Sequence, residues 1–151
     1  MRDSRGMVDV GDKAVTARTA RACGAIVLGE PAFEAVRQGT CVKGDVLATA
    51  KVAAIGAVKS TPALIPMCHP ILIEGVDVEF ELSEADKSVT VTVTVKSSGK
   101  TGVEMEALTG AAVGCLTIYD MLKYTGKAMT IGEIMLVEKT GGKSGDYKRQ
   151  D

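Results

Sequence analysis

The stretch LIEGVDVEFELSEADKSVTVTVTVK, residues 72–96, decides the fold. Before its central turn, the even-numbered positions from Val76 to Leu82 are apolar and the positions between them are acidic. After the turn, the odd-numbered positions from Val89 to Val95 are valine and the positions between them are threonine. Alternation with a period of two is typical of strands that bury one face. The stretch therefore predicts an antiparallel β-hairpin with one buried face.

The rest of the chain adds helices and two more strands on either side of this hairpin. The expected elements are a strand at 19–28, a short helix at 31–37, an Ala-rich helix at 44–59, the hairpin, a long helix at 102–124 and a strand at 130–139. This βαββαβ order predicts an α+β, ferredoxin-like fold, an antiparallel sheet with helices packed on one face. Residues 1–151 are expected to form a single domain, with 1–15 and 140–151 loosely ordered.

Composition narrows the classes of function. A net charge of -1, with two Phe, three Tyr and no Trp, supplies neither a basic field nor a stacking platform for nucleic acid. No apolar run is long enough to span a bilayer, so no membrane partner is expected. The four cysteines form no CxxC pair, which argues against structural zinc and a dithiol redox motif. With no signal-like N-terminal segment, a cytoplasmic location is expected.

The single histidine, His69, lies in the run IPMCHP at 65–70. An unperturbed imidazole titrates near neutral pH, and Pro66 and Pro70 restrict the residues before them to extended conformations. Such stiffness suits a pre-organised binding site, and it equally suits the start of a strand. Cys68 beside His69 could supply half of a metal site, but no cluster of further ligands is visible, so no metal site is expected.

Two runs that contain Gly-Lys resemble phosphate-binding loops. SGKT at 98–101 and GKS at 142–144 both fail the Walker A pattern, because Thr94 and Val137 stand where its first glycine is required. Lys100 beside the free N–H groups of the long helix could still hold an anion, or the segment could be a plain capped turn. Lys43 lies just before the Ala-rich helix. Its side chain could bind an oxyanion beside the free N–H groups of that helix, or it could simply be solvated.

The long helix carries two stripes. Its predicted core stripe consists of Leu108, Ala111, Ala112, Cys115, Leu116, Tyr119 and Leu122. The second stripe is small in the middle and charged at both ends, and it consists of Glu106, Gly110, Val113, Thr117, Asp120 and Lys123. Taken singly, these charges have structural explanations: Glu104 and Glu106 complement the helix dipole, and Asp120 with Lys123 forms a surface ion pair.

The length of that helix limits what its charges can do together. Glu106 and Asp120 are fourteen residues apart, which is about 21 Å along a helix axis. They cannot both grip one small ligand from a single chain. If both are functional, either there are two sites or one site combines two subunits. We predict an oligomer with a shared pocket.

Five runs, in this order and spacing, resemble the cyclic pyranopterin monophosphate synthase family, the C protein of molybdenum cofactor biosynthesis. The resemblance covers nearly the whole chain. The run at 43–61 is long, and the runs at 64–70 and 100–123 are highly specific. The runs are MVDV at 7–10, KGDVLATAKVAAIGAVKST at 43–61, LIPMCHP at 64–70, KTGVEMEALTGAAVGCLTIYDMLK at 100–123 and GGKSGDY at 141–147.

This resemblance implies a reaction and an assembly. The family, a group of lyases, converts a cyclised dihydro-GTP to cyclic pyranopterin monophosphate and releases pyrophosphate. It implies a homo-hexamer, a trimer of dimers, with the active site between subunits. It implies no cofactor apart from Mg²⁺ that could arrive with the triphosphate.

Carried over residue by residue, the resemblance also implies a site. The catalytic positions would be Asp120, Lys123 and Lys43, and the substrate contacts Met67, Cys68, His69, Met105, Glu106 and Glu104. In this hypothesis Lys123, set by Asp120, moves protons, while Lys43 and His69 contact phosphate or sugar oxygens.

Two rival hypotheses belong to other classes. A ferredoxin-like regulatory module would bind a small phosphorylated metabolite without turning it over, and it would tolerate changes at Asp120 and Lys123. A non-enzymatic assembly subunit would favour a uniformly apolar second stripe, which those two charges contradict.

Overall fold

A computed structural model describes residues 5–151 of the chain. The predicted hairpin is present as β2 (Gly75–Ser83) and β3 (Ser88–Gly99). The two strands pair antiparallel, with Val78 opposite Val93 and Phe80 opposite Val91, so the apolar positions share one face. The alternation specifies this register strongly, because a slip of one residue would turn every valine of β3 to the other face.

The hairpin is one edge of a five-stranded antiparallel sheet. β3 pairs with β1 (Thr16–Val27), β1 with β4 (Thr130–Thr140) and β4 with β5 (Tyr147–Lys148), giving the order β2-β3-β1-β4-β5. This sheet and its helices confirm the predicted α+β, ferredoxin-like fold. β5 is an addition to the predicted elements, a two-residue strand within the Gly/Lys-rich tail.

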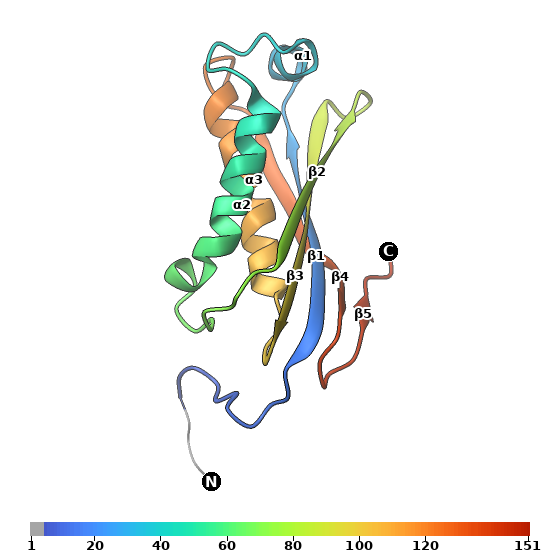
Figure 1. Cartoon of the computed structure of the whole chain (residues 1–151). Coiled ribbons are helices and arrows are strands. Elements are labelled where there is room, and N and C mark those ends of the chain that lie inside the picture. The colour runs from blue at the N-terminus through green and yellow to red at the C-terminus, as the bar shows by residue number, and fades with distance from the viewer. Residues whose placement is uncertain (1–4) are drawn as a thin grey trace.

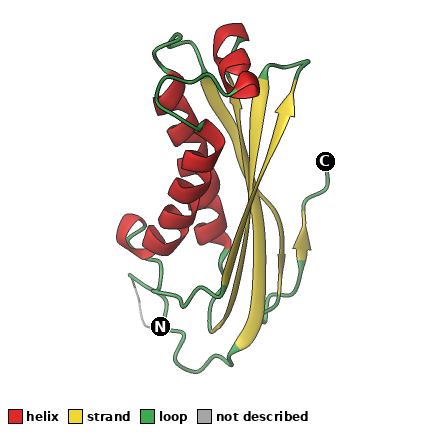
Figure 2. Ribbon diagram, turned by 45° about the horizontal axis from the view of Figure 1, so that its top comes forward, coloured by secondary structure: helices red, strands yellow, loops and turns green. Residues whose placement is uncertain are grey.

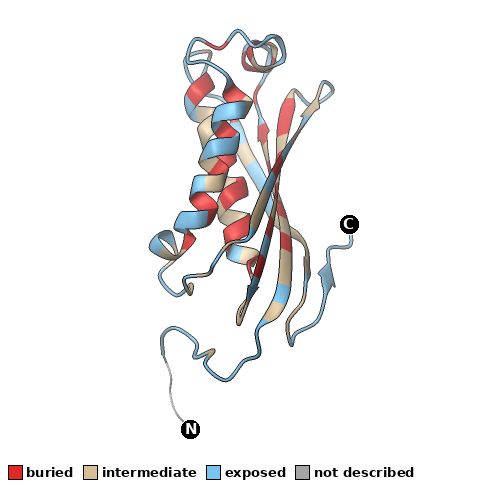
Figure 3. Ribbon diagram, viewed as in Figure 1, coloured by how far each residue is buried: buried red, intermediate tan, exposed pale blue. Residues whose placement is uncertain are grey.

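Helices cover one face of this sheet. α2 (Val46–Leu64) and α3 (Glu104–Leu122) lie side by side against it, while the short α1 (Glu30–Gln38) lies at the end of the sheet where the hairpin turns (Figure 1). The helix layer and the sheet layer are separate in the second view (Figure 2). The buried residues line the surface where the two layers meet (Figure 3).

The sequence accounts for both ends of α2. At its start, the Asp45 carboxylate accepts a hydrogen bond from the N–H of Ala48 at 2.9 Å, a typical N-cap. The expected end at residue 59 was wrong, because the helix continues past Pro62. Proline removes one helical hydrogen bond, but the buried Thr61 hydroxyl donates to the Ala57 carbonyl at 3.0 Å and the Ile65 N–H to the Thr61 carbonyl at 2.8 Å. Both bonds lie in the last turns of the helix, whereas the carbonyl that loses its helical donor at Pro62 is that of Val58.

α3 packs on α2 and on the sheet through a face that only partly matches the predicted core stripe. Ala111, Cys115 and Leu122 of that stripe are fully buried, as predicted. Leu116, assigned to the core, is 57% exposed, whereas Gly110 and Gly114 are buried. A Cβ at Gly110 would lie 2.9 Å from Cγ2 of Val58 and 3.1 Å from Cγ1 of Val93. The two glycines let the backbones approach closely, and a stripe drawn through large apolar residues missed this contact.

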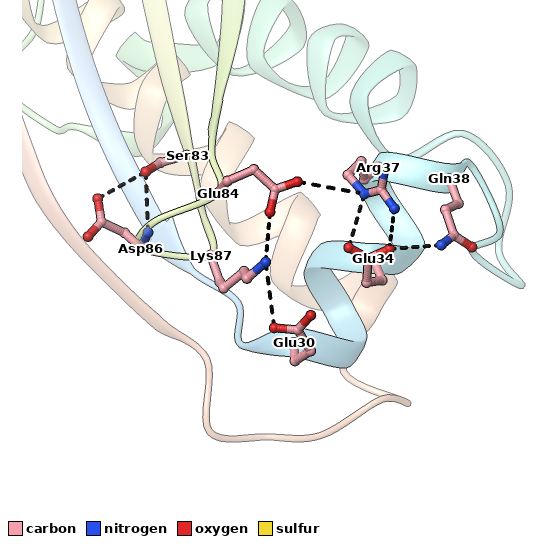
Figure 4. Close-up of polar contacts among 8 residues, drawn as sticks. All are labelled: Glu30, Glu34, Arg37, Gln38, Ser83, Glu84, Asp86 and Lys87. Carbon is pink, nitrogen blue, oxygen red and sulfur yellow. Dashed lines mark hydrogen bonds and ion pairs between the residues drawn. The ribbon is translucent and has the colours of Figure 1, made fainter.

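A polar clamp joins α1 to the turn of the hairpin (Figure 4). The Lys87 ammonium lies 2.7 Å from the Glu84 carboxylate and 3.6 Å from that of Glu30, and it stands 5.0 Å from the centroid of the buried Phe33 ring. Surface ion pairs of this kind stabilise little individually. Their role here is positional, because the loop that follows α1 carries part of the candidate site.

Candidate functional site

The predicted catalytic residues meet at the C-terminal end of α3. Lys123 Nζ lies 2.7 Å from Oδ1 of Asp120, and Lys43 Nζ lies 3.1 Å from its Oδ2. Lys43 also donates to the Asp120 carbonyl at 3.0 Å. We call these three residues the lysine–aspartate cluster. Sequence spacing predicted the contact between Asp120 and Lys123, but not the arrival of Lys43 from the loop before α2.

Two hydrogen bonds from the residues just before Lys43 fasten that loop to the C-terminal end of α3. The Cys41 thiol donates to the Met121 carbonyl at 3.4 Å, and the N–H of Val42 donates to the Tyr124 hydroxyl at 3.3 Å. Since Cys41 is buried and precedes Lys43 by two residues, the direction from which the lysine reaches Asp120 is set by the core.

The cluster carries two positive charges and one negative charge. The hydrogen bonds from Lys123 and then Lys43 lower the pKa of the Asp120 carboxyl below its ordinary value, and Asp120 in turn raises the pKa of Lys123. At neutral pH the Lys123 side chain is therefore a cation and Asp120 a carboxylate. All three side chains are 41–57% exposed, so the cluster is open to a ligand.

The predicted substrate contacts meet at the opposite end of α3. All six line one small cavity of about 150 Å³, which we call the Glu106 cavity; they are Met67, Cys68, His69, Glu104, Met105 and Glu106. The turn after α2, closed by a hydrogen bond from the N–H of Cys68 to the Ile65 carbonyl at 3.1 Å, carries Cys68 and His69 toward the first turn of α3.

Burial controls the ionisation of this cavity. Glu106 is only 2% exposed, and burial, followed by the nearby charge of Glu104, raises the pKa of its carboxyl. Burial and then the charge of Glu106 raise the pKa of the Cys68 thiol. Cys68 is therefore a neutral thiol at neutral pH and not an activated nucleophile. A nearly enclosed carboxyl group can hold a hydrogen-bonding ligand firmly, because water competes weakly for it.

A larger cavity of about 870 Å³ adjoins the Glu106 cavity. We call it the cationic cavity, because four basic side chains line it, namely Lys13, Arg18, Lys139 and Lys143. The carboxylates of Asp12 and Glu104 line it as well, and the Lys139 ammonium lies 3.9 Å from Oε1 of Glu104. Its charge suits a ligand with several negative charges.

Sequence analysis missed the basic residues of this cavity. They come from the N-terminal segment, β1, β4 and the turn after β4, so no single short motif contains all four. One signal was available in the run Gly142-Lys143-Ser144, which fails as a Walker A loop. Gly142 has a φ of +84°, and a Cβ there would overlap the Arg18 guanidinium. Glycine at this position therefore lets Arg18 reach the cavity.

A third cavity, of about 260 Å³, lies beside the other two. We call it the Val10 cavity; Val10, His69 and Lys100 are among its lining residues. Thr101 lines all three cavities, His69 lines two of them and Glu104 lines two. The three cavities thus adjoin one another around the segment that connects β3 to α3.

The lysine–aspartate cluster and the Glu106 cavity are far apart within the chain. They occupy opposite ends of α3, and the fourteen residues from Glu106 to Asp120 correspond to about 21 Å. The structure therefore brings the nine predicted site residues together as two groups, three at one end of α3 and six at the other.

The fold and these two groups define a ferredoxin-like α+β protein whose charged residues suit a small anionic ligand. The chain belongs to the MoaC family, which it matches over residues 7–142. It is 51% identical over 146 residues to proteins of Bacillus thuringiensis (strain Al Hakam), Bacillus cereus (strain AH820) and Bacillus anthracis (strain A0248). Each is named cyclic pyranopterin monophosphate synthase, and each alignment covers 95% of this chain and 91% of the relative.

Two further observations concern residues 5–151 alone. Within this range, no three His, Cys, Asp or Glu side chains are grouped as a metal site would require. None of the helices in the same range has the length and apolar character needed to cross a membrane.

Proposed function

We propose that this chain is a cyclic pyranopterin monophosphate synthase of molybdenum cofactor biosynthesis. In this proposal it is a cytoplasmic lyase that converts a cyclised dihydro-GTP to cyclic pyranopterin monophosphate and releases pyrophosphate. The supporting observation is that the nine residues assigned to the site from the family's motifs form two compact groups in a chain 51% identical to proteins of that name.

The triphosphate is assigned to the cationic cavity. Its four basic side chains match the charge of a triphosphate and can neutralise the departing pyrophosphate, a form of electrostatic stabilisation. Asp12 and Glu104 offer carboxylate oxygens, the donors that Mg²⁺ prefers, to a magnesium ion carried by the phosphates.

The ring system of the substrate is assigned to the adjoining Glu106 cavity. Met67 and Met105 supply polarizable apolar surface for a flat ring, and His69 and Glu106 supply hydrogen-bonding groups. Because Glu104 lines both cavities, a ligand with its ring in one and its phosphates in the other would pass beside this carboxylate.

The lysine–aspartate cluster is assigned to a neighbouring subunit. A distance of about 21 Å along α3 prevents one chain from applying Asp120 and Glu106 to the same ring. We propose a homo-hexamer built as a trimer of dimers, in which the cluster of one subunit completes the cavities of its partner. The exposure of all three cluster residues is consistent with a surface that meets another chain.

The ionisation of the cluster favours one direction of proton transfer first. Lys123, kept as an ammonium by Asp120, is ready to donate a proton to a nitrogen or oxygen of the ring as the rearrangement begins. After donation the free amine can accept a proton, so the same residue can act in both directions. Lys43 is assigned to the phosphate or sugar oxygens of the ligand.

The decisive experiment is to incubate the purified protein with the cyclised dihydro-GTP. Pyrophosphate and cyclic pyranopterin monophosphate should appear in equal amounts, measured by a coupled phosphate assay and by mass spectrometry. GTP itself is the control and should yield neither product. If the protein binds the cyclised compound without converting it, the regulatory module is the better description.

A further inference from the structure

A short N-terminal segment borders two of the three cavities. Residues 8–14, which we call the N-terminal strap, run below the ends of the sheet and α2 (Figure 1). Val10 lines the Val10 cavity together with His69, and Asp12, Lys13 and Ala14 line the cationic cavity. The position of this strap therefore determines where the Lys13 ammonium and the apolar Val10 side chain lie in the site.

The strap has little to hold it in place. All its residues except Val10 are exposed. Its own hydrogen bonds are local, from the N–H of Gly11 to the Asp9 carboxylate at 2.8 Å and from the N–H of Lys13 to the Val10 carbonyl at 3.1 Å. Within the described residues 5–151, Lys100 reaches it from a distant part of the chain, and its Nζ donates to the Gly11 carbonyl at 2.6 Å.

Lys100 is well placed to serve as an anchor. It follows the last residue of β3, and the Gly99 carbonyl accepts a hydrogen bond from Nε of Arg18 at 2.9 Å. Arg18 lines the cationic cavity, and Thr101 on the other side of Lys100 lines all three cavities. Lys100 thus lies between residues that shape the site, and its ammonium donates a charge-assisted hydrogen bond to the exposed strap.

We propose that Lys100 is a positioning residue that fixes the N-terminal strap through the Gly11 carbonyl. The bond holds Lys13 toward the phosphates in the cationic cavity and Val10 against the His69 side of the ring. The proposal rests on the proposed function for its kinetic consequence, but the anchoring itself is a property of the chain alone. Lys100 supports binding and takes no part in the chemical step.

The kinetic test compares three variants with the wild type. Lys100→Met should raise KM for the cyclised dihydro-GTP about tenfold, since a strap that samples other positions offers Lys13 less often, while kcat stays within about twofold. Lys100→Arg, which keeps a charged donor, should restore most of the affinity. Lys51→Met removes an exposed lysine in the middle of α2 and should leave both constants unchanged. A fall in kcat without a change in KM would overturn the proposal.

Proteolysis tests the anchor without any substrate. Trypsin should cleave after Lys13 several times faster in Lys100→Met than in the wild type, Lys100→Arg or Lys51→Met, as measured by mass spectrometry of the released N-terminal peptide. Equal cleavage rates in all four proteins would overturn the proposal, even if the kinetics of Lys100→Met changed. If the wild type converts no substrate, the proposed function fails, whereas the cleavage rates still decide whether Lys100 anchors the strap.

Discussion

Glu106 is a carboxyl group whose ionised form the folded protein disfavours. Its folded-state pKa is raised by burial, so ionisation costs more in the native chain than in the unfolded one. Stability should therefore decline as the pH rises from the ordinary glutamate value of 4.5 through the raised folded pKa. In the proposed function, this costly burial gives Glu106 a protected hydrogen-bonding position in the Glu106 cavity.

Glu106→Gln should separate these two roles. The amide removes the ionisation penalty, so the variant should melt at a higher temperature than the wild type at pH 8 and at nearly the same temperature at pH 4. Turnover should fall, because the proposed contact between this carboxyl group and the ring is lost. Thermal unfolding at both pH values measures the first effect, with Glu79→Gln on the exposed face of β2 as the control. A melting difference independent of pH would contradict the raised pKa.

Asp120 organises two lysines, and its replacement should affect the reaction alone. Asp120→Asn removes the negative charge that orients both ammonium groups, so turnover should fall by about 10²–10⁴-fold, the range usual for acid–base groups. The melting temperature should hardly change because the side chain is exposed. Pyrophosphate release measures turnover, and Asp77→Asn, another exposed aspartate, is the matched control. Turnover within twofold of the wild type would exclude Asp120 from the chemistry.

At the scale of the element, the packing of α3 depends on glycines, which have no side chain to separate its backbone from its neighbours. Gly110→Ala should destabilise the protein by about 1–2 kcal/mol, because overpacking against Val58 and Val93 outweighs the gain of about 1 kcal/mol in helix propensity. Gly56→Ala in α2 is the matched control, since a Cβ there meets nothing within 4 Å, and it should stabilise the chain by about 0.5–1 kcal/mol. Urea unfolding measures both. If Gly110→Ala is also stabilising, the contact between α2 and α3 is looser than described.

The elements differ in how far their sequences reveal them. The hairpin was predictable to its register, because the alternation of valine and threonine in β3 shows which face of the sheet each side chain occupies. The buried face of α3 was predictable only in part: Ala111, Cys115 and Leu122 were placed in the core, but Gly110 and Gly114 have no hydrophobic side chains to place on a stripe. The end of α2 was also missed, because the Ala-rich pattern from which the helix was drawn stops at Lys59, whereas the helix runs on to Leu64.

In the candidate site too, contacts between residues close in the sequence were predictable, and contacts between distant residues were not. The contact of Asp120 with Lys123 is local to one helix and follows from a spacing of three residues. Lys43 joins Asp120 from 77 residues away, and only the folded loop held by Cys41 reveals this contact. The cationic cavity was unpredictable for the same reason, since its basic side chains come from separate elements and meet through the sheet.

For the whole molecule, the proposed shared site makes activity a property of an assembly, and mixed assemblies should reveal it. Asp120→Asn and Glu106→Gln damage groups at opposite ends of α3, so a dimer containing one chain of each would hold one doubly damaged site and one intact site. Random pairing of two inactive variants during co-expression should therefore restore about a quarter of the wild-type rate.

Asp120→Asn mixed with Lys123→Met is the control, because both changes lie in the lysine–aspartate cluster and no pairing leaves an intact site. Native mass spectrometry confirms that the oligomers are mixed. If they are mixed and the first combination stays as inactive as the second, the two ends of α3 do not form a shared site, and the distance between them must be bridged in some other way.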